Sequence, residues 1–236
     1  MIVVGIQAVT EALRSSAARV ERLWVARGGR GRRLQAILDL ARSRRIPLQF
    51  EAAEVLSRRA GSPGAYKVVA RLGEVDTVPL GQVLESKLLL LADGVEDPRN
   101  LGALLRTAEA TGVDAVILPD RRSCGLTSTV VETSAGGALH VPVVRVTNSG
   151  RALDTLKQKG FWVLGLDLQG EERLDGVDLV VPLVLVVGGE HRGLRPSVLN
   201  RCDYRVGLPM LGRVRSLNLS VAAGVVLYEI IFARDR

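Results

Sequence analysis

The sequence predicts an α/β protein, with a small N-terminal α/β domain followed by a larger domain built on a mostly parallel sheet. Strand-like apolar runs alternate with helical segments along most of the chain. In the last two thirds these runs are apolar at nearly every position, as in strands buried on both faces of a parallel sheet. The 236 residues are 47% hydrophobic, which suits a globular protein of one large or two modest domains.

The N-terminal domain is expected over residues 1–72. Its helix over 30–45 carries Leu34, Ile37, Leu38 and Ala41 at the i, i+3, i+4, i+7 spacing of a buried helical face. A second helix is expected over 52–60 and should stop at Gly61. Strands are expected over 20–25, 46–50 and 66–72.

Residues 73–86 are expected to be a linker, because they are polar, contain one proline and have no strong hydrophobic period. The larger domain then covers 87–236 and alternates strands with helices. Its expected strands are 88–92, 115–118, 141–146, 161–166, 183–187 and 204–208. Its expected helices are 101–111, 128–135, 151–159, a short one after Pro196, and 219–233.

The helix over 219–233 is apolar on almost every side. Such a helix lies in a core or at an interface. This pattern favours a homodimer in which the last helix is covered by a second copy.

Several classes of protein are disfavoured by what the sequence lacks. No run approaches the roughly 18 apolar residues of a membrane span, and the N-terminal segment does not resemble a signal peptide, so we expect a cytoplasmic protein with no membrane contact. Cys124 and Cys202 are far apart, and His140 and His191 are too scattered for a zinc cluster, so we expect no metal. We expect His140 to be structural and without polar neighbours.

The positive charge is confined to the first third of the chain. Residues 1–72 hold fourteen basic and five acidic side chains, whereas the remainder is slightly acidic. A separate basic module favours binding to nucleic acid through phosphate charge and shape, because aromatic residues make up only 3%. The alternative is that the arginines form a solvated face. The candidate RNA-binding residues here are Arg32, Arg33, Arg44 and Arg45.

Three glycine-containing or polar motifs follow apolar strands. They are DGVEDPRNLGALLRTAEATG (93–112), VVGGEHRGL (186–194) and LPMLGRVRSLNLSVAAGVVLYE (208–229). Glycine turns let several backbone groups approach one ligand, because no Cβ obstructs them. In order and spacing the three motifs resemble those of the SpoU family of RNA 2′-O-methyltransferases. VGIQAVTEAL and YKVVARL resemble, more weakly, the substrate-binding domain of that family.

The resemblance implies a C-terminal trefoil knot that holds S-adenosylmethionine, an N-terminal RNA-binding domain, and a homodimer. It implies transfer of a methyl group from S-adenosylmethionine to a ribose 2′-hydroxyl, and is closest to enzymes that modify a guanosine of 23S rRNA. Alternatives that stay open are tRNA methylation, an antibiotic-resistance methylation of rRNA, and a non-catalytic RNA-binding or assembly protein. A nucleotide-dependent oxidoreductase is disfavoured, because the Rossmann glycine turn is missing, as is a Walker A loop.

The matches to the motifs also imply site residues. The catalytic candidates are Asn100, Arg106, Glu190, Ser216 and Asn218, and the cofactor-binding candidates are Gly188, Leu208 and Leu217. Arg192, Arg195, Arg213 and Arg215 flank them and suit phosphate contacts, and His191 is a minor candidate.

Some of these residues have a plain structural alternative. Asn100 or Ser216 could cap a helix, and Glu190 could serve as a charge at a helix N-terminus. The Arg106 guanidinium stays protonated in proteins, so binding a phosphate and polarising the hydroxyl suits it better than acting as a base.

Overall fold

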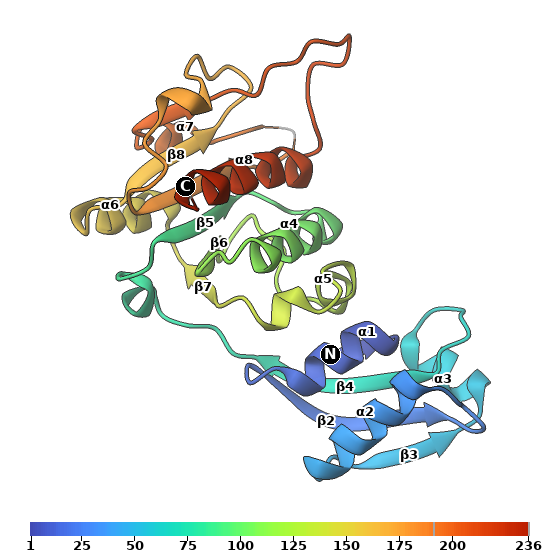
Figure 1. Cartoon of the computed structure of the whole chain (residues 1–236). Coiled ribbons are helices and arrows are strands. Elements are labelled where there is room, and N and C mark those ends of the chain that lie inside the picture. Colours follow the sequence, from blue (N-terminus) through green and yellow to red (C-terminus); the bar gives the residue numbers. More distant parts are fainter. Residues whose placement is uncertain (191, 236) are drawn as a thin grey trace. The chain divides into compact units, whose positions relative to one another are not determined.

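The structure is a computed structural model that describes residues 1–190 and 192–235 (Figure 1). It divides into two compact units. The first unit consists of Met1–Asp76 and Leu126–His140, and the second consists of Thr77–Gly125 and Val141–Arg236. Leu126–His140 thus comes from the part of the chain that we assigned to the larger domain. The α/β class with a parallel sheet is confirmed.

The first unit is built on a four-stranded sheet in the order β1-β4-β2-β3. Its strands are β1 (Ile2–Val4), β2 (Ala18–Ala26), β3 (Leu48–Glu51) and β4 (Val68–Val75). β2 and β3 are parallel, and the other two pairs are antiparallel. Its first three helices are α1 (Ile6–Arg14), α2 (Arg32–Ser43) and α3 (Ala53–Ala60). Sequence analysis used VGIQAVTEAL only for its resemblance and did not identify β1 and α1, although Ala8, Val9, Ala12 and Leu13 form a buried helical face.

Helix α2 is shorter at both ends than the predicted 30–45. Gly31 precedes it with φ 131°, and Arg45 lies in the left-handed region with φ 56°. The predicted apolar face is confirmed, since Leu34, Ile37, Leu38 and Ala41 are buried. Arg30, Arg44 and Arg45 therefore lie outside the helix.

The predicted linker over 73–86 contains regular structure. β4 continues to Val75, which is buried and pairs with Ala18. A 3-10 helix, η1 (Leu80–Val83), follows and buries Val83. Sequence analysis missed these elements, because the apolar side chains that pack there, Val78, Leu80, Val83 and Leu84, follow no regular period.

Helix α5 (Ser128–Thr133) and the 3-10 helix η2 (Gly137–Leu139) complete the first unit. The Ser15 hydroxyl donates to the carbonyl of Leu139 at 2.5 Å. His140 Nε2 lies 3.0 Å from Glu11 Oε2. The prediction that His140 has no polar neighbour was wrong, because its partner is distant in sequence.

The second unit is built on a six-stranded sheet in the order β10-β8-β9-β5-β6-β7, with every pair parallel. The strands are β5 (Leu88–Asp93), β6 (Ala115–Pro119), β7 (Val143–Val146), β8 (Trp162–Leu166), β9 (Leu183–Gly188) and β10 (Tyr204–Val206). β5 and β9 are buried at every position, as the continuous apolar runs predicted.

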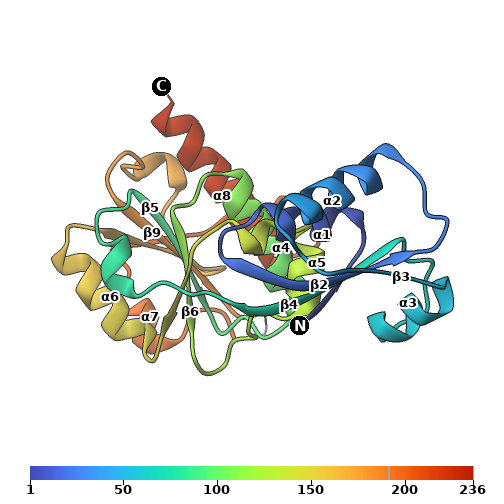
Figure 2. The same ribbon diagram turned by 90° about the horizontal axis from the view of Figure 1, so that it is seen from below.

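Helices cover both faces of this sheet (Figure 2). They are α4 (Pro98–Ala110), α6 (Ser149–Gln158), α7 (Pro196–Leu199) and α8 (Leu219–Arg234), and a 3-10 helix, η3 (Leu174–Gly176), precedes β9. α6 and α7 lie on one face, and α4 and α8 pack together on the other. In the described part of the chain no helix is long and apolar enough to cross a membrane.

Helix α4 begins three residues before its predicted start. Asp97 is its N-cap and accepts a hydrogen bond from the backbone N–H of Arg99, with Pro98 at the first helical position. Asn100 therefore lies inside the first turn, and its interpretation as a cap was wrong. Asn218, rather than Ser216, caps α8 by accepting from the N–H of Ser220.

The strand order brings distant parts of the sequence together. β9 inserts between β8 and β5, so the carboxyl ends of these strands lie at one edge of the sheet. Ligands of open α/β sheets bind at this edge, where the order of strands reverses. The trefoil knot stays a prediction about the path of the chain after β9.

Candidate functional site

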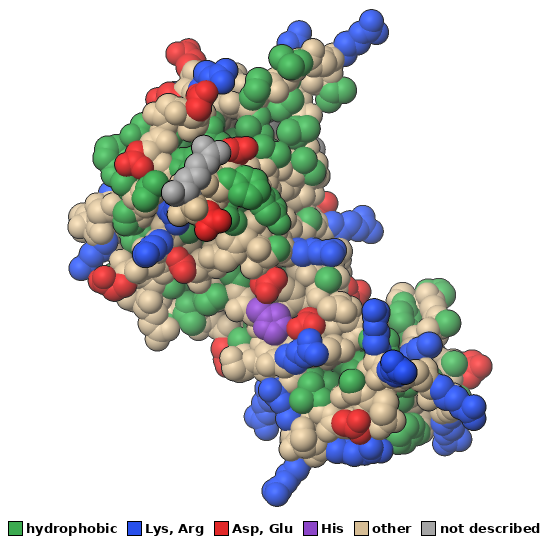
Figure 3. Space-filling model, in the orientation of Figure 1, with side chains coloured by type: hydrophobic (Ala, Val, Ile, Leu, Met, Phe, Trp, Pro, Cys, Tyr) green, Lys and Arg blue, Asp and Glu red, His purple; other side chains and the backbone are tan. Residues whose placement is uncertain are grey.

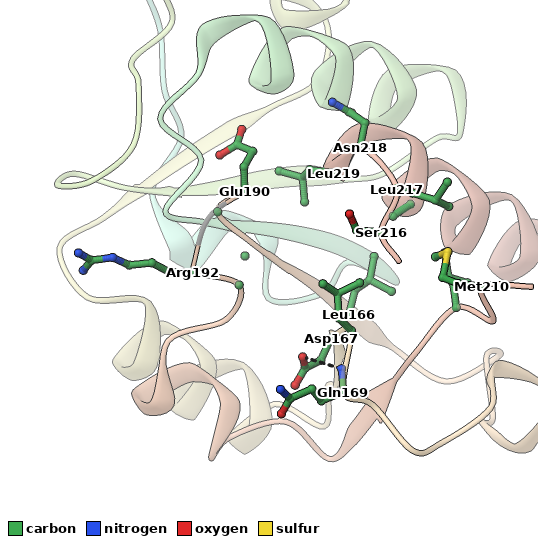
Figure 4. Close-up of a pocket in the computed structure, with 16 residues that line it drawn as sticks. Leu166, Asp167, Gln169, Glu190, Arg192, Met210, Ser216, Leu217, Asn218 and Leu219 are labelled. Atoms are coloured by element: carbon green, nitrogen blue, oxygen red, sulfur yellow. Dashed lines mark hydrogen bonds between the residues drawn. The ribbon is translucent and has the colours of Figure 1, made fainter. Parts of the chain in front are cut away.

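A cavity of about 580 Å³ lies at this edge of the second unit (Figure 4). The turns after β8 and β9 and the segment between β10 and α8 form its wall. It is lined by Leu166, Asp167, Leu168, Gln169, Gly188, Gly189, Glu190, Arg192, Gly193, Leu208, Met210, Ser216, Leu217, Asn218, Leu219 and Ala222. Apolar side chains and backbone dominate, with a few polar groups, as in most small-molecule sites.

Glycines are required where the backbone segments of this wall meet. A Cβ on Gly188 would lie 2.1 Å from the carbonyl carbon of Gly193, and one on Gly189 would lie 2.3 Å from the carbonyl oxygen of Gly94. Gly193 donates to the carbonyl of Gly189 at 2.9 Å and has φ 58°, which favours glycine. The glycines let the turn after β9 fold back tightly and leave backbone groups facing the cavity.

Three side chains from the three motifs meet beside this cavity. The amide of Asn100, on α4, donates to Glu190 Oε1 at 2.6 Å. The amide of Asn218, at the start of α8, donates to the Asn100 carbonyl oxygen at 2.9 Å. Residues 90 and 118 positions apart in sequence are thus joined in one chain of hydrogen bonds.

The direction of these hydrogen bonds is fixed from one end. Asn218 Oδ1 accepts from the backbone N–H of Ser220, which can only donate. The Asn218 amide nitrogen must therefore face Asn100, and the Asn100 amide nitrogen must face the Glu190 carboxylate. The network holds both amides in one orientation.

Comparison with known proteins agrees with this geometry. Residues 87–228 match the model of the SpoU rRNA Methylase family, and residues 2–73 match a model described as RNA 2′-O ribose methyltransferase substrate binding. The chain belongs to the SpoU family. Members of this family are RNA 2′-O-ribose methyltransferases that use S-adenosylmethionine.

Known relatives match nearly the whole length of this SpoU-family chain. It is 42% identical to the 23S rRNA (guanosine-2′-O-)-methyltransferase RlmB of Pseudomonas aeruginosa, over 98% of this chain and 96% of the relative. It is 36% identical to YacO of Bacillus subtilis, named for the TrmH family of tRNA/rRNA methyltransferases, over 99% and 96%. The crystal structure of the SpoU methyltransferase AviRb from Streptomyces viridochromogenes superposes with a TM-score of 0.85 at 26% identity, covering 100% of this chain and 90% of that one.

The structure brings together most of the site residues that the SpoU motifs implied. Gly188, Leu208 and Leu217, the cofactor candidates, all line the cavity. Among the catalytic candidates, Glu190, Ser216 and Asn218 line it too, and Asn100 is joined to two of them.

Arg106 lies apart from these residues. It is exposed on α4, does not line the cavity, and forms no ion pair or hydrogen bond within residues 1–190 and 192–235. Arg99 is exposed seven residues earlier, on the same side of the helix. Neither guanidinium group has a partner in the described part of the chain, so both can meet an anionic substrate next to Asn100.

The arginines assigned to RNA differ in their surroundings. Arg32, Arg33, Arg44 and Arg45 are all exposed in the first unit, where blue side chains gather in Figure 3. Arg44 donates to the carbonyl of Ser15 at 3.3 Å. In the second unit Arg192, Arg213 and Arg215 are exposed, and Arg192 extends away from the other lining side chains (Figure 4). Arg195 instead pairs with the buried Asp93, and His191 lies outside the described residues.

Sequence reasoning missed one wall of the cavity. Leu166, Asp167, Leu168 and Gln169 follow β8, and Asp167 Oδ1 accepts from the N–H of Gln169 at 3.1 Å. No motif marks these residues, and only the strand order places the end of β8 beside that of β9. Met210 was quoted within the third motif but was not selected.

The cysteines are not set up for nucleophilic chemistry. Burial raises the pKa of the Cys124 and Cys202 thiols to about 11, so both are protonated at neutral pH. Among the described residues, no three His, Cys, Asp or Glu side chains are grouped so as to hold a metal ion.

Proposed function

We propose that this SpoU-family protein methylates the ribose 2′-hydroxyl of a guanosine in 23S rRNA. The observation that carries the proposal is the hydrogen-bonded chain from Asn218 through Asn100 to Glu190, which joins all three motifs beside one cavity. The 42% identity to RlmB of Pseudomonas aeruginosa over nearly the full length supports the choice of RNA.

The cavity suits S-adenosylmethionine. Gly188, Leu208 and Leu217 would hold it, because the close backbone approach at the glycines leaves main-chain groups and apolar walls to receive an adenosine. When bound, the cofactor supplies an electrophilic methyl group on a sulfonium. Ser216 and Glu190 add polar contacts at the same wall.

The residues of α4 would orient the acceptor ribose. The ordered Asn100 amide keeps one N–H beyond the one given to Glu190, and this N–H can hold a ribose oxygen. The Arg106 guanidinium would bind the neighbouring phosphate and polarise the hydroxyl. Orientation of a poor nucleophile against an activated methyl group is where such a site gains most of its rate.

RNA would be bound by both units. The arginines of the first unit supply charge for phosphates, and Arg192, Arg213 and Arg215 would contact the strand near the cavity. We also propose a homodimer formed through α8, a knotted C-terminal segment, and action in the cytoplasm, where rRNA is made and assembled.

Mapping of ribose methylation in a deletion strain tests the substrate. We expect one guanosine of 23S rRNA to lose its 2′-O-methyl group and to regain it when the gene is restored. Restoration with an Asn100→Ala variant should fail. Loss of a methyl group from tRNA with 23S rRNA unchanged would contradict the rRNA assignment and favour the tRNA alternative. If the deletion changes ribose methylation in none of the cellular RNAs, the proposal that the enzyme methylates cellular RNA is contradicted.

A further inference from the structure

A buried carboxylate lies directly beneath the turn that forms the cavity wall. Asp93 is the last residue of β5, is fully buried, and is in register with Gly188 at the end of β9. A carboxylate in such a place requires charged or hydrogen-bonding partners, because its desolvation is unfavourable. Asp93 itself does not line the cavity.

Its partners come from two other elements. Arg195 Nε donates to Asp93 Oδ2 at 2.7 Å, and Arg195 Nη2 donates to the other oxygen. The Ser149 hydroxyl, at the start of α6, donates to Asp93 Oδ1 at 2.7 Å and accepts from Arg195 Nη2 at 3.2 Å. Arg195 and Asp93 thus form a bidentate, charge-assisted pair, a geometry that fixes the orientation of both side chains strongly.

Arg195 follows the second motif immediately. Gly189 follows the end of β9, Gly193 bridges back to Gly189, and Leu194 leads to Arg195. One end of this turn is thus held by the sheet beside Asp93, and the other end by the ion pair with Asp93. Glu190 and the glycines of the wall lie between these two anchors.

We propose that Asp93 and Arg195 are a positioning pair that holds Gly189, Glu190 and Gly193 in their places in the cavity wall. The pair acts through Glu190 on Asn100 and through Gly188 and Gly189 on the cavity wall, and does not touch RNA. This inference rests on the proposed function, and it removes Arg195 from the phosphate-binding role that the sequence favoured.

A second ion pair in the same unit, whose carboxylate is 46% exposed where Asp93 is buried, provides a control of the same bonding geometry. Arg201 donates to Asp154 through Nε at 2.8 Å and through Nη2 at 3.0 Å, again with two prongs. The Arg201 side chain is 33% exposed and that of Arg195 is 32% exposed. Neither Arg201 nor Asp154 lines the cavity. Arg→Lys at either site keeps the charge and removes the two-pronged bond.

The experiment compares full-length Arg195→Lys with Arg201→Lys. Calorimetry measures the affinity for S-adenosylhomocysteine, filter binding measures the affinity for 23S rRNA fragments, and thermal melting measures stability. For Arg195→Lys we expect the affinity for S-adenosylhomocysteine to fall by about tenfold or more, while RNA affinity stays within about twofold. Arg201→Lys should keep both affinities, even if its melting temperature falls as far as that of Arg195→Lys.

Ser149→Ala tests the same network if Arg195→Lys fails to fold, because it removes one hydrogen bond and keeps the ion pair. We expect a smaller loss of affinity for S-adenosylhomocysteine, about threefold. Equal affinities in wild type, Arg195→Lys and Ser149→Ala would overturn the positioning role. Loss of RNA affinity alone in Arg195→Lys would overturn it too, in favour of a phosphate contact. Wild-type protein that does not bind S-adenosylhomocysteine would instead overturn the proposed function, on which this inference rests.

Discussion

The interpretation of Asn100 changes once its neighbours in the structure are known. In the sequence it precedes an apolar helical run, as a cap would. The pair Asp97-Pro98 provides a stronger start signal three residues earlier, and the structure uses it. Asn100 is thereby left free to join Glu190 and Asn218.

Asn100→Ala should therefore lower methyl transfer by a factor of about a hundred or more and leave helix stability almost unchanged. Asp97→Ala is the matched control, since it should lower the free energy of unfolding by about 1 kcal/mol through loss of the cap while keeping most activity. Denaturant titration and single-turnover transfer to rRNA measure the two effects. A large fall in the free energy of unfolding of Asn100→Ala would contradict this separation between the catalytic role of Asn100 and the capping role of Asp97.

Arg106→Ala should abolish methyl transfer and leave the affinity for S-adenosylmethionine nearly unchanged, because Arg106 does not line the cavity. Arg99→Ala, on the same side of α4, also removes an exposed charge and should weaken RNA binding only mildly. Turnover near that of wild type in Arg106→Ala would show that the catalytic assignment is wrong.

The two thiols should react slowly with alkylating reagents at pH 8, because burial raises the pKa of Cys124 and Cys202 to about 11. Since the folded pKa exceeds the unfolded value, their contribution to stability is complete below about pH 8.5 and is lost as the pH rises towards 11. Mass spectrometry after timed iodoacetamide treatment, in native buffer and in guanidinium, measures this. Equal rates in both conditions would contradict it.

At the scale of elements, helix α8 divides into two faces that its composition alone did not separate. Ala223, Val226, Leu227 and Ile230 are buried, on a helix that packs against α4. The other face exposes a stripe of large apolar side chains, namely Val221, Val225, Tyr228 and Phe232. The apolar pattern predicted that α8 would be covered, but which face lies against this chain depends on α4.

Val225→Glu should convert the proposed dimer to a monomer, because it puts a charge at the centre of this exposed stripe. Arg234 is a control position at the end of the helix, where its guanidinium donates to the carbonyls of Leu179 and Val181; Arg234→Lys should leave the mass unchanged. Light scattering at micromolar concentration measures the mass. A wild-type monomer with full activity would contradict the homodimer.

At the scale of the whole molecule, the charge division is visible in the sequence, whereas the composition of the units is not. The excess of arginine in residues 1–72 predicted a basic module. That Leu126–His140 groups with this module follows from contacts such as His140 with Glu11, which no local pattern encodes. For the same reason the end of β8 could not be assigned to the cavity before the strand order was known. The motif residues were identifiable because the three motifs resemble those of the SpoU family.

Reversal of Arg32, Arg33, Arg44 and Arg45 to glutamate should lower RNA affinity steeply and flatten its dependence on salt, because the slope follows the number of phosphates neutralised. This is a cleaner test than deletion of residues 1–72, which would also expose Leu126–His140. Reversal of Arg192, Arg213 and Arg215 provides the comparison. Filter binding at several salt concentrations measures both, and an unchanged slope in the fourfold variant would contradict the role of the first unit.

The insertion of β9 between β8 and β5 also has a consequence for how the chain acquires its shape. Leu88 pairs with Leu183, about a hundred residues later, so the centre of the sheet closes only when most of the chain is available. Parallel pairings of such separation form slowly. The cavity in addition needs residues of the segment 208–218, which is synthesised after every strand of this sheet. A nascent chain can therefore hold a complete N-terminal sheet while it has no cofactor site, and ligand binding reports a step that follows the pairing of β5 with β9.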